Sequence, residues 1–216
     1  MITIFGSSTA YVSMPRYGKS YVHLLQESRQ DVHSHCMNGY TIWHANYMIP
    51  RLLTERNSSN VIILHVGACE AMTMELKNFL VLSTYWLNFG EVDEWFRTYI
   101  VPKIYQASSD LLEGKKNFYS LLDSGEFSNL YARVLKHLEG YKVLCIGMSR
   151  PSNEVSDIRI EQAASFDLAI RLLCIPFPQV EYIEVCKLCE GEVVDSNHLT
   201  EQGHKLLYNE ILRRIN

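Results

Sequence analysis

The 216-residue chain has 47% hydrophobic and 20% charged residues, proportions that argue against a disordered, fibrous or coiled-coil protein. Twenty basic against 24 acidic residues give a net charge of −4, so the charge balance makes no general case for nucleic acid as a partner. No apolar run approaches the roughly 20 residues of a membrane span. The first six residues lack the basic region of a signal peptide, and we therefore expect a cytoplasmic protein.

Short β-branched apolar runs alternate with longer helical patterns along the chain. The runs predict five strands, at residues 2–5, 31–35, 61–66, 142–146 and 180–185. The helical patterns fall at residues 18–28, 41–56, 70–86, 91–112, 116–139, 158–173 and 200–214, with Thr200 as the expected N-cap of the last helix. Most of the strands are apolar on both faces, as a parallel sheet covered by helices requires. The sequence therefore predicts a single α/β domain over residues 1–216, a three-layer flavodoxin-like sandwich with a five-stranded parallel sheet.

One connection is longer than a crossover needs. About 75 residues separate the third predicted strand from the fourth, and we expect a helical insertion over about residues 70–139. The segment is rich in aromatic residues. One interpretation is an ordinary buried helix face, and another is a subdomain that forms a lid over the site or a dimer contact.

Ligands of open α/β sheets bind beyond the carboxyl ends of the strands, so the loops that follow the strands are the candidate site. These loops contain Gly6-Ser7-Ser8-Thr9, Cys36-Met37-Asn38-Gly39, Gly67-Ala68-Cys69-Glu70 and Gly147-Met148-Ser149-Arg150-Pro151-Ser152-Asn153. Asp195-x-x-His198 stands just before the last helix. A serine, glycine-containing loops and an Asp-x-x-His would thus meet at one edge of the sheet. Together they supply the nucleophile, oxyanion donors, base and orienting carboxylate of a serine hydrolase.

The spacing suits that chemistry. A serine hydroxyl is a weak nucleophile that needs an imidazole to take its proton. A carboxylate three residues before the histidine is able to hold the imidazole in one tautomer. A serine in a tight strand-to-helix turn also offers its backbone N–H to a developing oxyanion.

The order of these blocks resembles that of the SGNH (GDSL-like) hydrolase superfamily. In that family a Gly-Asp-Ser block follows the first strand, a lone Gly the second and Gly-x-Asn-Asp the third, and Asp-x-x-His precedes the final helix. The resemblance implies that Ser8, His198 and Asp195 are the catalytic residues. It also implies that Ser8 and Gly39 contribute to the oxyanion hole.

Two residues depart from the family pattern. Ser7 replaces the usual Asp, and Cys69-Glu70 replaces Asn-Asp in the third block. The family's Asn donates to the oxyanion, whereas a thiol is a weak donor, and losing one such donor typically costs about 10²–10³ in rate. Cys69 is therefore one candidate for the oxyanion hole, and Asn38, beside Gly39, is another. In its altered third block, the sequence is similar to the SGNH-like proteins of bacterial surface-polysaccharide biosynthesis.

Other interpretations of single motifs are less favoured. Gly6-Ser7-Ser8-Thr9-Ala10 resembles an α/β-hydrolase nucleophile elbow, but that elbow lies mid-chain, with its acid and histidine on separate loops. Gly6-Ser7-Ser8 also lacks the Lys and the further glycines of a P-loop. The pair Cys186 and Cys189 forms only half of a zinc site, so we expect structural thiols there. We expect all six cysteines to be reduced. His204 is expected on the surface of the last helix. No motif calls for a metal or a cofactor.

The sequence thus predicts a serine-dependent acyl transfer on an ester, with an O-acetyl or similar carbohydrate ester as the expected substrate. The acyl group passes to water in an esterase and to a sugar hydroxyl in an acyltransferase, and both share the acyl-enzyme step. The alternative is a non-catalytic, carbohydrate-binding or interaction protein with the same fold. A homodimer through the long insertion is a further candidate partnership.

Overall fold

Five parallel strands form the central sheet of the protein. The structure is a computed structural model that describes residues 1–11, 18–55, 61–71, 74–75, 101–114, 118–119, 122–150, 157–194 and 197–216. The strands are β1 (Ile2–Gly6), β2 (Val32–Cys36), β3 (Val61–His65), β6 (Lys142–Ile146) and β7 (Val180–Ile183). Their spatial order is β2-β1-β3-β6-β7, which is the flavodoxin-like order. The predicted fold class is therefore confirmed.

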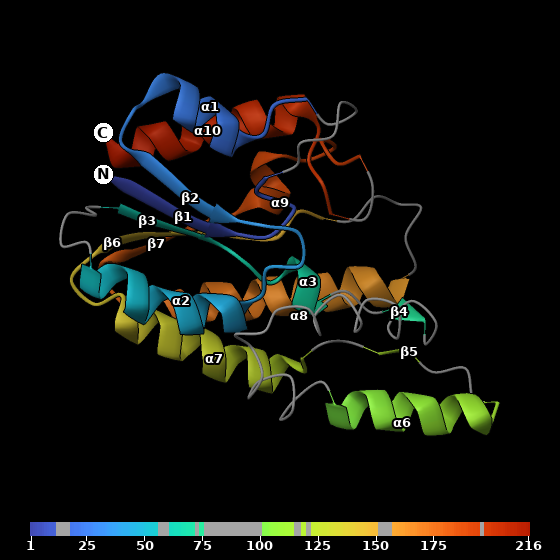
Figure 1. Cartoon of the computed structure of the whole chain (residues 1–216). Helices are drawn as coiled ribbons and strands as arrows, with labels where there is room; N and C mark the ends of the chain where they lie inside the picture. Colours follow the sequence, from blue (N-terminus) through green and yellow to red (C-terminus); the bar gives the residue numbers. More distant parts are fainter. Residues whose placement is uncertain are drawn as a thin grey trace.

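Helices cover both faces of the sheet (Figure 1). On one face lie α1 (Tyr21–Ser28) and α10 (Glu201–Ile215), and on the other α2 (Ile42–Glu55), α7 (Ser124–His137) and α8 (Asp157–Cys174). Successive strand residues point to opposite faces. Ile4 of β1 accordingly packs in the core beneath α1 and α10, while its neighbour Phe5 packs in the core on the other side. This alternation of two apolar faces explains why the strands read as continuous apolar runs.

The long connection between β3 and β6 contains several short elements. They are α3 (Ala68–Ala71), β4 (Met74–Glu75), α6 (Val101–Leu112) and β5 (Phe118–Tyr119), and β4 pairs antiparallel with β5. The sequence analysis predicted helices at residues 70–86 and 116–139. The strand β4 lies within the first of these ranges and β5 within the second, so both predictions are wrong at these residues. At its end, α7 packs against α2 and α8 in the helical layer. Residues 76–100 lie outside the described residues. This segment contains many of the aromatic residues on which the lid and dimer interpretations rest.

Two predictions near the carboxyl terminus need correction. The last strand ends at Ile183 rather than at residue 185, because Val185 begins the short helix α9 (Val185–Leu188). His204 is fully buried rather than on the helix surface, since it faces the core between α10 and α1 and its ring lies 6.1 Å from that of Tyr21. Thr200 is confirmed as the N-cap of α10, with its side chain accepting from the backbone N–H of Gly203.

All six cysteines carry free thiols. Cys186 and Cys189 lie on and just after α9, where Cys189 Sγ is 3.4 Å from the carbonyl oxygen of Gly203. Within the described ranges, no three His, Cys, Asp or Glu side chains are grouped as metal ligands would be. None of the helices in those ranges combines the length and the apolar character that a membrane crossing requires.

Candidate active site

The turn after β1 presents Ser8 at the carboxyl edge of the sheet. Ser7 and Thr9 are buried on either side of it, while Ser8 itself is partly exposed. The backbone N–H of Ala10 donates to the carbonyl of Ser7 at 3.0 Å, which closes the turn. A Cβ at Gly6 would lie 2.6 Å from the Cβ of Ala10, so the close approach of the turn to the strand requires glycine at this position.

His198 reaches the same edge from the loop before α10. Its Nε2 lies 3.2 Å from Ser8 Oγ, although 190 residues separate the two in the sequence. The backbone N–H of Val194 donates to the carbonyl of His198 at 2.8 Å, and Val193 and Leu199 form an isolated antiparallel bridge. A hydroxyl and an imidazole at this distance form the arrangement in which serine is activated as a nucleophile. Asp195, the expected orienting carboxylate, lies outside the described residues.

Ser149, in the loop after β6, ties the histidine loop to the sheet. Its Oγ donates to the carbonyl of Asn197 at 2.8 Å, and its side chain is buried. The sequence analysis named the loop after the fourth strand as a candidate but gave Ser149 no role. Its position at the carboxyl end of a parallel strand was the signal that marked it as a neighbour of the site.

We expect Ser149→Ala to lower kcat/KM of an ester substrate about 3- to 10-fold, because a buried hydrogen bond contributes about 1 kcal/mol to holding the loop. Ser128→Ala is the matched control, since Ser128 Oγ also donates to a carbonyl, that of Ser124, but on the exposed side of α7. Steady-state kinetics of both variants check the expectation. Equal losses in the two variants would show that Ser149 does not act through the His198 loop.

The loop after β2 brings Gly39 to the site. Gly39 has a φ of +74°, a left-handed conformation that favours glycine. Just before it, the backbone N–H of Met37 donates to the carbonyl of Gly6 at 3.2 Å, which joins this loop to the end of β1. Asn38 has an exposed side chain. The loop that carries Gly39 is thus joined to the end of β1, and the Asn38 side chain faces solvent.

Cys69 lies at the start of α3 and is buried. Its side chain is 7% exposed. Burial and the neighbouring Glu70 raise the pKa of its thiol to about 12, against the opposing effects of the Gly39 backbone and the Ser7 hydroxyl. The thiol is therefore protonated at neutral pH and does not have the thiolate character of a nucleophilic cysteine.

Glu70 is a buried carboxyl that joins the third loop to the second. It is fully buried, and its Oε1 accepts from the backbone N–H of Ile42, the first residue of α2. Burial raises the pKa of this carboxyl to about 7, although the N–H of Ile42 favours its charged form. The sequence analysis noted Glu70 only as a departure from the family pattern. The structure shows that it ties the Gly67–Glu70 loop to the start of α2.

The raised pKa makes Glu70 a source of pH-dependent stability. Its pKa rises from 4.5 to about 7 on folding, so its contribution is intact below pH 4.5 and is lost as the pH rises to 7. A change of this size corresponds to about 3 kcal/mol. Glu70→Gln keeps the acceptor for Ile42 but never ionises. We expect its free energy of unfolding, relative to wild type, to be higher at pH 8 than at pH 5 by about that amount, as measured by urea denaturation; parallel pH profiles would contradict this.

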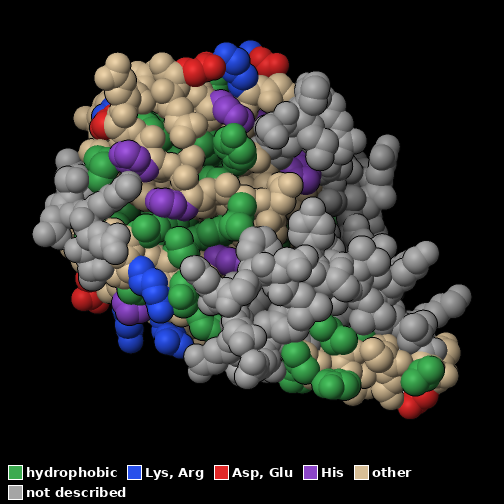
Figure 2. Space-filling view, viewed as in Figure 1, with side chains coloured by type: hydrophobic (Ala, Val, Ile, Leu, Met, Phe, Trp, Pro, Cys, Tyr) green, Lys and Arg blue, Asp and Glu red, His purple; other side chains and the backbone are tan. Residues whose placement is uncertain are grey.

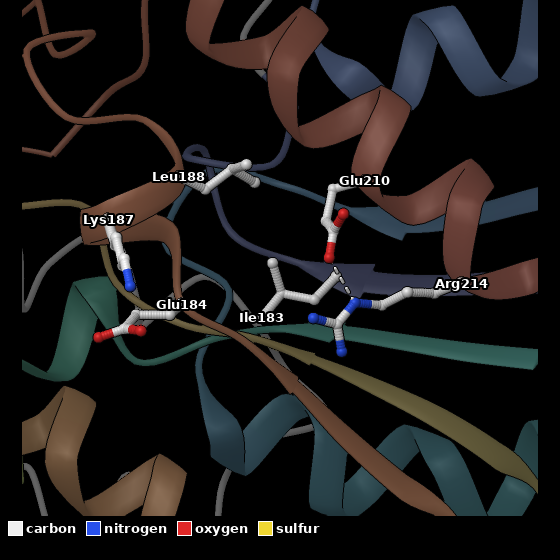
Figure 3. Close-up of a pocket in the computed structure, with 6 residues that line it drawn as sticks. All are labelled: Ile183, Glu184, Lys187, Leu188, Glu210 and Arg214. Atoms are coloured by element: carbon white, nitrogen blue, oxygen red, sulfur yellow. Dashed lines mark hydrogen bonds and ion pairs between the residues drawn. The ribbon is translucent and has the colours of Figure 1, made fainter.

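A pocket elsewhere on the surface does not include these residues. It lies between β7, α9 and α10 (Figure 3). Its volume is about 420 Å³. Its Arg214 donates to Glu210 at 2.7 Å and to Glu181 at 3.1 Å. Since this guanidinium is already neutralised by carboxylates, we assign the pocket no part in the chemistry. Figure 2 shows histidine and hydrophobic side chains across the described part of one face, with Lys and Arg gathered at its top and lower left.

Comparisons with known proteins identify the fold. No protein-family model and no curated protein matches the chain. The chain does match solved structures. A member of the lipolytic protein G-D-S-L family from Veillonella parvula is similar with a TM-score of 0.61 at 12% identity, over 98% of this chain and 96% of that chain.

Two esterases of carbohydrate substrates are similar as well. A catalytic mutant of an acetylxylan esterase from Geobacillus stearothermophilus has a TM-score of 0.62 at 10% identity, over 100% of this chain and 93% of that chain. A carbohydrate acetylesterase from Sinorhizobium meliloti has a TM-score of 0.60 at 11% identity, over 99% of this chain and 97% of that chain. The chain has the fold of the SGNH (GDSL-like) hydrolases.

Proposed function

We propose that the protein catalyses serine-dependent acyl transfer from an ester. The observation that carries this proposal is the 3.2 Å distance between Ser8 Oγ and His198 Nε2 at the carboxyl edge of the sheet. In the proposed mechanism Ser8 is the nucleophile, His198 the general base, and Asp195 the carboxylate that orients the imidazole.

The reaction runs in two halves. Ser8 Oγ attacks the ester carbonyl carbon while its proton passes to His198 Nε2. The backbone N–H groups of Ser8 and Gly39 donate to the resulting oxyanion. The intermediate collapses, the alcohol leaves with the proton from His198, and the acyl group stays on Ser8 as an ester. Water or a sugar hydroxyl, deprotonated by His198, then attacks this ester and regenerates Ser8.

The proposed substrate is a carbohydrate carrying an O-acetyl or similar acyl group. Support comes from the two structurally similar proteins that act on acetylated carbohydrates, an acetylxylan esterase and a carbohydrate acetylesterase. The further assignment to surface-polysaccharide biosynthesis is the finer part of the same proposal. It rests on the altered third block, in which Cys69 stands where the family has Asn.

The test is acetate release. Wild-type protein and Ser8→Ala are incubated with acetylated xylo-oligosaccharide and with p-nitrophenyl acetate, and free acetate is measured. We expect release by the wild type alone. A parallel incubation with a non-acetylated sugar separates the two reaction types, because an acyltransferase forms a new sugar ester in place of acetate. Equal release by Ser8→Ala would contradict the proposal.

The second candidate is a non-catalytic carbohydrate-binding protein. The observation that favours it is Cys69 itself, because a buried thiol with a pKa of about 12 supplies a much weaker oxyanion donor than an amide. Saturable binding of an acetylated sugar without turnover, equal in wild type and Ser8→Ala, would support this candidate.

A further inference from the structure

A set of buried polar side chains lies directly beneath the turn that carries Ser8. Ser7 is 0% and Thr9 3% exposed, so the residues on either side of Ser8 point into the protein. Their hydroxyl oxygens lie 2.8 Å apart. In addition, the backbone N–H of Ser7 donates to the carbonyl of His65 at 3.1 Å. The turn is therefore held from below by both backbone and side-chain contacts.

The side chain of His65 connects this turn to helix α1. His65 is the last residue of β3, the strand beside β1, and follows four apolar strand residues. Its Nε2 lies 3.4 Å from Thr9 Oγ1, and its Nδ1 lies 3.2 Å from the hydroxyl of Tyr21, the first residue of α1. A buried imidazole is costly in a sheet unless both nitrogens have partners. At this position both do.

The protonation states give the contacts a direction. Burial, together with the nearby His204, lowers the pKa of His65 to about 3, so the ring is neutral and carries one N–H. Burial and Cys36 raise the pKa of Tyr21, which keeps its proton. When Tyr21 donates to Nδ1, the tautomer is fixed with hydrogen on Nε2, and Nε2–H donates to Thr9.

The same direction continues to the wall of the site. Thr9, having accepted from His65, donates to Ser7, and the Ser7 hydroxyl lowers the pKa of the Cys69 thiol, which is the effect of a donor beside the sulfur. In this arrangement every hydroxyl hydrogen has an acceptor. In the reverse arrangement the hydroxyl hydrogen of Tyr21 has no acceptor among the contacts of the described residues. The buried chain thus runs Tyr21, His65, Thr9, Ser7, Cys69.

We propose that His65 is a positioning residue, whose side chain holds the Gly6–Thr9 turn through Thr9 and so fixes Ser8 against His198. The proposal rests on the proposed function in that Ser8 is the nucleophile. The backbone contact between residues 7 and 65 is available to any residue at position 65. Only the imidazole links Thr9 to Tyr21, so the contribution of the ring is separable by mutation.

Variants separate the ring nitrogens from the ring volume. His65→Phe keeps an aromatic ring beside Tyr21 but removes both nitrogens, and we expect kcat to fall about 10- to 100-fold with KM nearly unchanged, as for a slightly misplaced nucleophile. His65→Gln restores an amide donor toward Thr9 and should recover most of the loss. Tyr21→Phe removes only the outer end of the chain and should have a smaller effect. Tyr131→Phe is its matched control, because Tyr131 is equally buried but lies in the core beneath α7.

A second readout does not depend on catalysis. The ring resonances of His198 are recorded by NMR in wild type, Ser8→Ala, His65→Phe and Tyr131→Phe. We expect His65→Phe to shift them toward those of Ser8→Ala and Tyr131→Phe to leave them in place. Folded His65→Phe protein with wild-type resonances overturns the proposal. If no ester is turned over by wild type while His198 still responds to His65→Phe, the proposed function fails and the positioning role stands.

Discussion

Ser8→Ala, His198→Ala and the double variant are each expected to lower kcat on an acetyl ester by about 10³–10⁶-fold, with little further loss in the double variant. The reason is that the two side chains, 3.2 Å apart, act as one unit. Without Ser8, His198 has no hydroxyl proton to accept. Without His198, Ser8 has no base to take its proton. Steady-state kinetics of the three variants, with melting temperatures to confirm folding, measure the effect. Additive losses in the double variant would contradict a shared step.

Two neighbouring substitutions sharpen this prediction. Asp195→Asn should cost less than His198→Ala, because the base survives in an unfavourable tautomer. Ser7→Ala should retain far more activity than Ser8→Ala, because the Ser7 hydroxyl points inward to Thr9. If Ser7→Ala abolishes turnover and Ser8→Ala does not, the nucleophile is the other serine of the turn.

Cys69→Asn is expected to raise kcat on a small aryl ester by about 10²-fold, since one well-placed oxyanion donor is worth roughly 2.7–4 kcal/mol. The surroundings favour a productive orientation. The Ser7 hydroxyl, which lowers the pKa of the Cys69 thiol as a nearby donor does, would hold the amide oxygen of Asn and leave its NH₂ group facing the oxyanion. The measurement is kcat of the variant against wild type.

Asn38→Ala and Cys69→Ala complete this experiment. Because the Asn38 side chain is exposed, its removal should leave kcat unchanged. Cys69→Ala should also stay within a few-fold of wild type, because a thiol is a weak donor. A strong loss in Asn38→Ala with no gain in Cys69→Asn would mean that the loop after β2, rather than the third block, completes the oxyanion hole.

The sheet, and the gathering of the loops that follow its strands at one edge, were predictable because both follow from the local hydrophobic pattern of the sequence. Five apolar runs separated by helical patterns require parallel strands, and parallel strands bring Gly6–Thr9, Gly39 and Cys69 to one edge whatever the details of the helices. The ends of the last strand were less predictable. Val180 to Val185 is a continuous mixture of apolar and acidic residues, and the change from strand to α9 after Ile183 leaves no mark in it.

The buried polar contacts could not be predicted, because each joins residues far apart in sequence. His204 looks like a surface residue on an amphipathic helix, and only the packing of α10 on α1 buries it beside Tyr21. Likewise, nothing in the sequence near His65 indicates that Tyr21, 44 residues away, supplies its partner. Long-range polar contacts of this kind depend on tertiary packing, whereas hydrophobic periodicity indicates only local secondary structure.

The central claim is that Ser8 is a nucleophile activated by His198, and covalent labelling tests it most directly. Wild type, Ser8→Ala, Ser7→Ala and His198→Ala are incubated with a fluorophosphonate, and intact mass and peptide mapping locate the adduct. The account predicts one phosphonyl group on Ser8 in wild type and in Ser7→Ala, none in Ser8→Ala, and strongly slowed labelling in His198→Ala. Wild-type protein that stays unlabelled, or an adduct that persists in Ser8→Ala, would contradict it.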